Sequence, residues 1–218
     1  MKLGAIFDMD GLLFDTERVY NEALYFIANQ YGLHVEQEML NKLRGTSGET
    51  MYNIVNTYWD SVDSKQLCDE LFAHAKKILQ HHVPVKEGVY EILSFFKEHH
   101  VKMAIASSAP RKLILHNIKE ANIQDYFDVI VSGDQVQHSK PSPDIFLLAA
   151  DKLKLSPRDC YVFEDGIHGV KAAVLAGCAT IMIPDLLPPT PQEYASCIGI
   201  YKSLDSFLNE LKSQIEHF

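Results

Sequence analysis

Short apolar runs alternate with longer amphipathic stretches along most of the chain. Runs that are apolar throughout are typical of strands buried on both faces of a parallel sheet. The stretches between most of these runs have the period of amphipathic helices, which predicts repeated strand–helix–strand units and an α/β fold. The predicted strands are Leu3–Phe7, Val101–Ala106, Val129–Val131, Tyr161–Phe163 and Ala179–Ile183, with a weaker one at Ile198–Tyr201.

The helices predicted between these strands have recognisable ends. Pro110 and Pro143 precede two of them, and proline is well tolerated in the first turn. Gly177 follows a third, where a glycine commonly ends a helix. The proline-rich stretch Pro184–Pro191 is interpreted as a surface loop. We predict helices at Glu87–His100, Arg111–Ala121, Asp144–Leu153, Gly166–Ala176 and Ser206–Ile215.

One long interval interrupts this alternation. From Asp15 to about His82 there is no strand pattern, only helical periodicity. An all-helical insert after the first strand is expected to form a second lobe. We therefore predict a sheet core made of residues 1–14 and 83–218 and a helical insert made of residues 15–82.

Composition narrows the class of protein. The 218 residues are 47% hydrophobic and 22% charged, as in an ordinary globular protein, and the net charge is −9. Such an acidic chain argues against a nucleic acid or an anionic membrane as partner. It carries no signal-peptide pattern and no apolar run of transmembrane length, so a cytoplasmic location is expected. The four cysteines form no C-x-x-C pair and are interpreted as free thiols.

Polar and charged residues gather where the predicted strands end. Asp8 and Asp10 follow the first strand, and Ser107 ends the second. Lys140 lies in the loop after the third. The neighbouring acids Glu164 and Asp165 end the fourth. Because ligands of open parallel sheets bind outside the carboxyl ends of the strands, these residues are expected to meet in one crevice.

The residue types in this crevice favour phosphate chemistry. Asp8, Glu164 and Asp165 offer the hard oxygens that suit Mg²⁺, and Lys140 is the cation of the set. Local positive charge is needed because a carboxylate that attacks a phosphate dianion is otherwise repelled. Residues two apart in an extended segment point to the same side, so Asp8 and Asp10 could serve one phosphate. One would attack as a nucleophile and the other would move protons.

Four stretches of the chain together resemble the motifs of the haloacid dehalogenase superfamily: "DMDGLLFDTE", "IASSAP", "SKPSPDIF" and "FEDGIHGVKAA". The branch that the chain resembles most is that of the β-phosphoglucomutase-like phosphatases with a helical cap. The resemblance covers nearly the whole chain, in order, including the position of the insert. It implies a Rossmann-like parallel sheet with helices on both faces and a four-helix cap inserted after the first motif.

The resemblance also implies roles for individual residues. Asp8 would be the nucleophile and Asp10 the general acid and base. Mg²⁺ would be held by the Asp8 side chain, the Asp10 backbone carbonyl and Asp165, with Glu164 close by. Phosphate binding is assigned to Ser107, Ser108, Lys140 and Gly11, with Ser107 preferred over Ser108, for which a turn role is the alternative.

The predicted cap carries candidate substrate residues, each with a simpler alternative. Asp15 and Thr16 are equally compatible with the start of a helix and with a hinge or substrate role. Arg44 and Gly45 lie in a cap loop that could face the crevice, although Arg44 alone would be a surface charge. Tyr20 stands where sugar phosphomutases of this branch carry a histidine.

These features predict a Mg²⁺-dependent phosphatase that acts on a small phosphomonoester, either a sugar phosphate or a nucleoside phosphate. The enzyme is expected to be a monomer. The alternative is a β-phosphoglucomutase-type sugar phosphomutase. Tyr20 argues against it, and so does Gly48, which replaces the distal arginine of the mutase cap loop.

Overall fold

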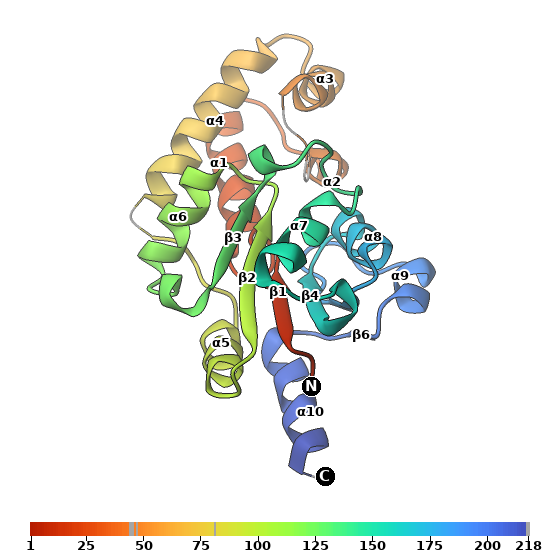
Figure 1. The fold of residues 1–218 in the computed structure, drawn as a ribbon. Coiled ribbons are helices and arrows are strands. Elements are labelled where there is room, and N and C mark those ends of the chain that lie inside the picture. Colours follow the sequence, from red (N-terminus) through yellow and green to blue (C-terminus); the bar gives the residue numbers. More distant parts are fainter. Residues whose placement is uncertain (44–45, 47, 81, 217–218) are drawn as a thin grey trace. The chain divides into compact units, whose positions relative to one another are not determined.

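The computed structural model describes residues 1–43, 46, 48–80 and 82–216 (Figure 1). These residues form two compact units. The first, the core, comprises residues 1–14 and 84–218, and the second, the helical unit, comprises residues 15–83.

A six-stranded parallel sheet lies at the centre of the core (Figure 1). The strand order β3-β2-β1-β4-β5-β6 reverses direction between β1 and β4, which is the doubly wound arrangement. In such sheets the point of reversal opens a crevice at the carboxyl ends of the strands. The strands are β1 (Gly4–Phe7), β2 (Lys102–Ser107), β3 (Val129–Ser132), β4 (Cys160–Glu164), β5 (Ala179–Met182) and β6 (Gly199–Ile200).

Helices cover both faces of the sheet, as the sequence predicts. On one face α7 and α8 pack on a cluster of buried aliphatic residues that includes Ile6 and Val162. On the other, Phe7 stacks on Phe163 with ring centroids 4.9 Å apart. The core helices are α5 (Val89–Glu98), α6 (Arg111–Glu120), α7 (Asp144–Leu153), α8 (Ile167–Ala176), α9 (Pro191–Ser196) and α10 (Leu204–Glu216), with short 3₁₀ turns η1 (Gln124–Tyr126), η2 (Gly133–Gln135) and η3 (Pro157–Asp159).

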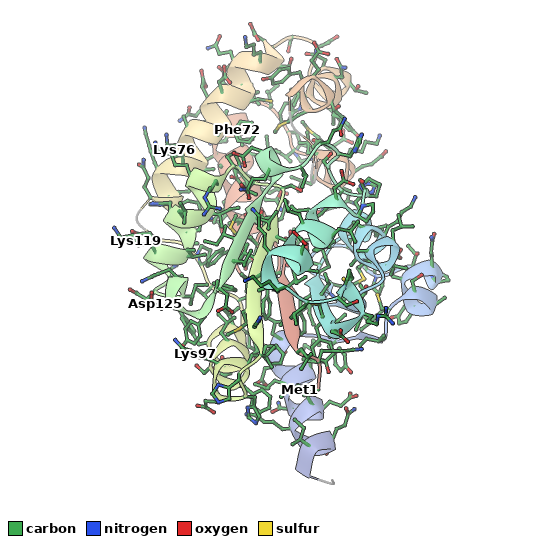
Figure 2. All side chains as sticks on the ribbon, in the orientation of Figure 1. Met1, Phe72, Lys76, Lys97, Lys119 and Asp125 are labelled. Atoms are coloured by element: carbon green, nitrogen blue, oxygen red, sulfur yellow. The ribbon has the colours of Figure 1, made fainter. Side chains whose placement is uncertain are left out.

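Polar contacts fasten these helices to the sheet connections. The Lys97 side chain of α5 donates a hydrogen bond of 3.1 Å to the Asp125 backbone oxygen in η1, and both residues are labelled in Figure 2.

Aromatic side chains pack on the face of the sheet that carries Phe7. Phe96 of α5 and Phe207 of α10 pack against Phe163. This second face of the sheet is therefore a layer of aromatic rings.

The proline-rich stretch is the predicted loop except for its last residue. A short helix, α9, begins at Pro191, the residue at which the predicted loop ends. Thr190 caps it, because the Thr190 side chain accepts from the Gln192 backbone and the Glu193 side chain accepts from the Thr190 backbone. The backbone N–H groups of the first helical turn have no acceptor within the helix, so the N–H that proline lacks is not missed there. Pro191 can therefore begin the helix.

The second unit is all-helical. In the part of this unit that the structure describes, the helices are α1 (Thr16–Gln30), α2 (Gln37–Leu43), α3 (Gly48–Tyr58) and α4 (Ser64–Leu79). They enclose a separate apolar cluster, which includes Leu24, Val55 and Leu71. The Asp63 side chain begins α4 by accepting hydrogen bonds from two backbone N–H groups of the first turn.

Among the described residues, none of the helices has the length and apolar character needed to cross a bilayer.

Candidate functional site

The loop after β1 places the first acidic residues. The backbone N–H of Asp8 donates to the Phe163 oxygen of β4 at 3.0 Å, so Asp8 is held at the point where the strand order reverses. The chain then turns tightly, and the Gly11 N–H donates to the Phe14 oxygen at 2.8 Å. Gly11 has a φ of 85°, and the position of a Cβ there is occupied by the Asp165 carboxylate. A glycine is therefore required at this position for both conformation and space.

Lys140 connects the acids of two strands. Its ammonium group donates to Asp8 Oδ1, to Glu164 Oε1 at 2.6 Å and to the Ala106 backbone oxygen at 3.3 Å. The Lys140 side chain is only 10% exposed. The peptide bond between Lys140 and Pro141 is cis.

Both carboxylate oxygens of Glu164 accept hydrogen bonds within the core. While Oε1 accepts from Lys140, Oε2 accepts from the backbone N–H groups of Asp165 at 3.0 Å and Gly166 at 3.1 Å. The carboxylate lies against the backbone of Gly169 in α8, where an added Cβ would overlap it. The side chain of Glu164 is 3% exposed, so this carboxylate is buried and fixed.

Burial and mutual repulsion shift the proton affinities of the cluster. Burial raises the pKa of Asp8 to about 7; Lys140 opposes this shift, while Glu164 and Asp10 add to it. Burial also raises the pKa of Asp165 well above its usual range, with further contributions from Glu164 and Asp8. Burial alone would lower the pKa of Lys140, but the Asp8 and Glu164 carboxylates raise it above its ordinary value. The single ammonium group therefore does not neutralise the carboxylates around it.

A divalent cation fits this cluster. Asp8, Glu164 and Asp165 each offer an oxygen, and these three atoms lie within 4.8 Å of one another. Carboxylate oxygens are the ligands that Mg²⁺ prefers. Burial, and then the neighbouring carboxylates, raise the pKa values of Asp8 and Asp165, and a bound cation would favour the charged form of both. The donor set and its charge therefore suit Mg²⁺.

The other predicted core residues lie at the same edge of the sheet. Asp10 is half-buried in the loop after β1, close enough for its charge to raise the pKa of Asp8. Ser107 ends β2, is 2% exposed, and its Oγ accepts from the Ala109 N–H at 3.1 Å. Ser108 is exposed.

The predicted substrate residues of the insert fall within the helical unit or outside the described residues. Thr16 is buried and begins α1, and Asp15 forms a 3.1 Å ion pair with Arg18. The rings of Tyr20 and Phe72 are in contact, with their centroids 6.0 Å apart. Their part in substrate binding stays a prediction. Arg44 and Gly45 lie outside the described residues.

Sequence reasoning missed two features of this edge. Lys86 and Asp185 form an ion pair, with Nζ 2.5 Å from Oδ1, although they are 99 residues apart in the chain. No local pattern signals a pair so distant in sequence. The close approach of Gly169 to Glu164 was also missed, although an unexplained glycine inside a helical pattern is a recognised signal of such contacts.

The chain is similar to known hydrolases and phosphatases. A family model described as "Haloacid dehalogenase-like hydrolase" matches residues 5–183. The chain is 34% identical over 177 residues to a "Phosphorylated carbohydrates phosphatase" of Thermotoga maritima, covering 81% of this chain and 82% of that protein. It is 31% identical over 199 residues to a "Probable pseudouridine-5'-phosphatase" of Drosophila melanogaster, covering 88% of this chain and 84% of that one.

The fold is also similar to that of a solved structure, over nearly the whole chain. The crystal structure of a putative β-phosphoglucomutase from Thermotoga maritima has a TM-score of 0.81 and 30% sequence identity. The match covers 98% of this chain and 99% of that chain.

Proposed function

The chain belongs to the haloacid dehalogenase-like hydrolase family, and from this premise we propose that it is a Mg²⁺-dependent phosphatase acting through an aspartyl-phosphate. The observation that carries the proposal is the contact of Lys140 with both Asp8 and Glu164 beside Asp165. The core thus holds a buried carboxylate, an ammonium group and further carboxylates at one edge of the sheet, which is the set that this reaction needs. As a phosphoric monoester hydrolase, it would act as a monomer in the cytoplasm on a small phosphorylated metabolite.

The roles of the chain's residues follow from their positions. Lys140 would hold a phosphoryl oxygen and lower the charge that Asp8 meets. Asp8 would attack phosphorus, and Asp10 would give the leaving alkoxide its proton. Asp10 would then take a proton from the water that hydrolyses the aspartyl-phosphate. Ser107, with Ser108 and the backbone of Gly11, would complete the phosphate contacts.

Asp8, Asp165 and the backbone carbonyl of Asp10 would hold Mg²⁺, with Glu164 close by. When bound, the cation supplies positive charge that offsets repulsion between the carboxylates and the phosphate. Glu164 would act chiefly on Lys140, because one of its oxygens accepts from that ammonium group and the other from two backbone N–H groups.

The proposed substrates are phosphorylated sugars and nucleoside monophosphates, the classes named in the Thermotoga and Drosophila relatives. The test is phosphate release by the purified protein, with Mg²⁺, across a panel of sugar, sugar-alcohol and nucleoside phosphates. Release from at least one member, abolished by a chelator and restored by Mg²⁺, is expected. Absence of release across the panel would contradict the proposal.

A sugar phosphomutase remains the second candidate, because the matched Thermotoga structure is that of a putative β-phosphoglucomutase. Tyr20 and Gly48 replace residues that a mutase of this branch is expected to use. Isomerisation of β-glucose 1-phosphate faster than phosphate release would place the mutase first.

Gly169→Ala tests whether the fixed Glu164 carboxylate matters. The new methyl group would overlap the carboxylate, so Glu164 must move and Lys140 loses one of its acceptors. Since a misplacement of about 1 Å can cost ~10²-fold in rate, kcat is expected to fall by that order. The added volume should also lower the free energy of unfolding by about 1–3 kcal/mol.

Gly166→Ala is the matched control. Its φ of −107° suits any residue, and an added Cβ would lie 3.9 Å from Glu164 Oε2, an ordinary van der Waals distance. Steady-state rates close to those of the unsubstituted protein are expected for this variant. Equal losses in the two alanine variants would show that the contact between Gly169 and Glu164 is not the cause.

The affinity for Mg²⁺ should rise with pH. Without metal, Asp8 is mostly protonated at pH 6 and mostly charged at pH 8, because its pKa is about 7. A cation competes with that proton, so the apparent dissociation constant should fall by roughly 10-fold between these pH values. Calorimetric titration with Mg²⁺ measures the change, and a constant affinity would contradict the raised pKa.

The stability of the metal-free protein should show the opposite trend. The pKa of Asp8 is higher in the folded state than its ordinary value of 3.8. Its stabilising contribution is therefore complete below about pH 4 and is lost as pH rises through about 7. Thermal denaturation with and without Mg²⁺ at pH 6 and pH 8 tests both pH trends. The Tm of the metal-free protein should be lower at pH 8, and the gain in Tm on adding Mg²⁺ should be larger there.

A further inference from the structure

The ion pair of Lys86 and Asp185 lies at the carboxyl edge of the sheet, yet the proposed chemistry does not use it. Asp185 follows β5, which pairs with β4. The backbone N–H of Ile183 donates to the Glu164 backbone oxygen at 2.7 Å, which holds the start of the loop at the end of β4. Asp185 is thereby held near the strand end that carries Glu164 and Asp165.

The backbone of Lys86 is hydrogen-bonded to the segment that follows β1. Its backbone N–H donates to the Leu13 oxygen at 3.0 Å, and the Leu13 N–H donates to the Met9 oxygen at 2.9 Å. Lys86 is therefore tied to the loop after β1, which carries Asp8 and Asp10. In the sheet β4 lies between β1 and β5, so the ion pair links the loop after β5 to a residue that is bonded to the loop after β1. These two loops flank the one that carries Asp165.

The second oxygen of Asp185 has unused bonding capacity. The side chain is 4% exposed, and Oδ2 is buried with no hydrogen-bond partner among the described residues. Leaving a buried acceptor without a donor costs about 1–3 kcal/mol, and more when it is charged. The charge of Asp185 contributes to the raised pKa of Asp165, so the two carboxylates lie within electrostatic range.

A metal site supplies the missing kind of donor. Mg²⁺ bound by carboxylates keeps several water ligands, and each such water has protons to donate. Hydrogen bonds to acceptors outside the ligand shell orient a metal site and strengthen binding. A further carboxylate far from any ligand would only add repulsion at this edge, whereas an acceptor for a bound water would stabilise the filled site.

We propose that Asp185 is a positioning residue for the metal site, accepting through Oδ2 a hydrogen bond from a water ligand of Mg²⁺ held by Asp165. Lys86 occupies Oδ1 and so fixes the direction of Oδ2. The inference rests on the proposed function, because it requires the Mg²⁺ site. It adds a residue outside the four recognised motifs to that site.

Calorimetric titration of the metal-free, full-length protein with Mg²⁺ tests this assignment. Asp185→Asn should weaken Mg²⁺ binding by about 10-fold or more. The single amide oxygen would stay with Lys86, and the NH₂ group would face a water that also donates. Glu98→Gln, an exposed acid on α5, controls for the loss of one charge and should leave the affinity unchanged.

The double variant Lys86→Met/Asp185→Asn separates positioning from structural support. Removing both partners should restore most of any stability that Asp185→Asn loses, as measured by urea denaturation, because no unpaired charge remains. Mg²⁺ affinity should stay low in the double variant. Recovery of affinity together with stability, or unchanged affinity in Asp185→Asn, would overturn the inference.

Asp165→Asn distinguishes failure of this inference from failure of the proposed function. If the unsubstituted protein binds Mg²⁺ and Asp165→Asn does not, the metal site stands whatever Asp185→Asn shows. If the unsubstituted protein binds no Mg²⁺, or Asp165→Asn binds it equally well, both the metal site and the role of Asp185 fall.

Discussion

Asp8→Asn is expected to lower phosphate release on the order of 10⁴-fold or more while the protein stays folded. The amide is a poor nucleophile, so no covalent phosphoenzyme can form at this position. The fold should persist because Lys140 keeps its 2.6 Å contact with Glu164 and its contact with the Ala106 oxygen. Steady-state phosphate release and circular dichroism together measure the effect.

Asp10→Asn is the informative partner of this variant. With an alkyl phosphate substrate it should lose about 10²–10⁴-fold in rate, the usual range for acid–base help. With an aryl phosphate whose leaving group needs no proton, transfer to Asp8 should still occur and then stall before hydrolysis. The intact-protein mass should therefore show phosphoenzyme in Asp10→Asn and none in Asp8→Asn. Phosphoenzyme in both variants would refute the assignment of Asp8 as nucleophile.

Lys140→Met should give the largest loss of stability. It leaves the buried carboxylates of Asp8 and Glu164 without their ammonium partner. Removing one partner from a buried ion pair costs about 3–5 kcal/mol, and this loss is expected at pH 8 in the metal-free protein. The loss should be smaller at pH 6, where Asp8 is largely protonated. Urea denaturation at the two pH values measures the difference.

Two variants complete the Lys140 experiment. Lys119→Met removes an exposed lysine, labelled in Figure 2, and should leave the free energy of unfolding nearly unchanged. Lys140→Met/Glu164→Gln removes one buried negative charge along with the ammonium group and should recover part of the lost stability. A loss in Lys140→Met that is independent of pH and of Glu164 would mean that packing of its side chain, not charge, explains the effect.

The fold could be predicted from the sequence because its signals are local and repeated. Each fully apolar run lies close to an observed strand, as Val129–Val131 does to β3. Asp144–Leu153 is found as α7 with the predicted bounds. The helix α9 was missed because its evidence is a cap and a proline within a stretch whose composition otherwise indicates a loop.

The site could be predicted as a set of strand-end residues but not as a bonded network. The parallel sheet brings Asp8, Lys140, Glu164 and Asp165 to one edge, and the pattern of strands is enough to expect this. The sequence does not reveal that Glu164 uses both oxygens within the core. Nor does it reveal the pair of Lys86 and Asp185, because their contact depends on loop conformations at two distant points of the chain.

The turn after β1 also decides how the helical unit is attached to the chain. Phe14, the last residue of the first core segment, forms an isolated antiparallel bridge with Val85, near the start of the second. The points where the polypeptide leaves and re-enters the core are therefore neighbours. An inserted segment of different length or sequence could be accommodated there without altering the sheet. Replacing the insert by a segment of another size should therefore leave Asp8, Lys140 and Asp165 in place.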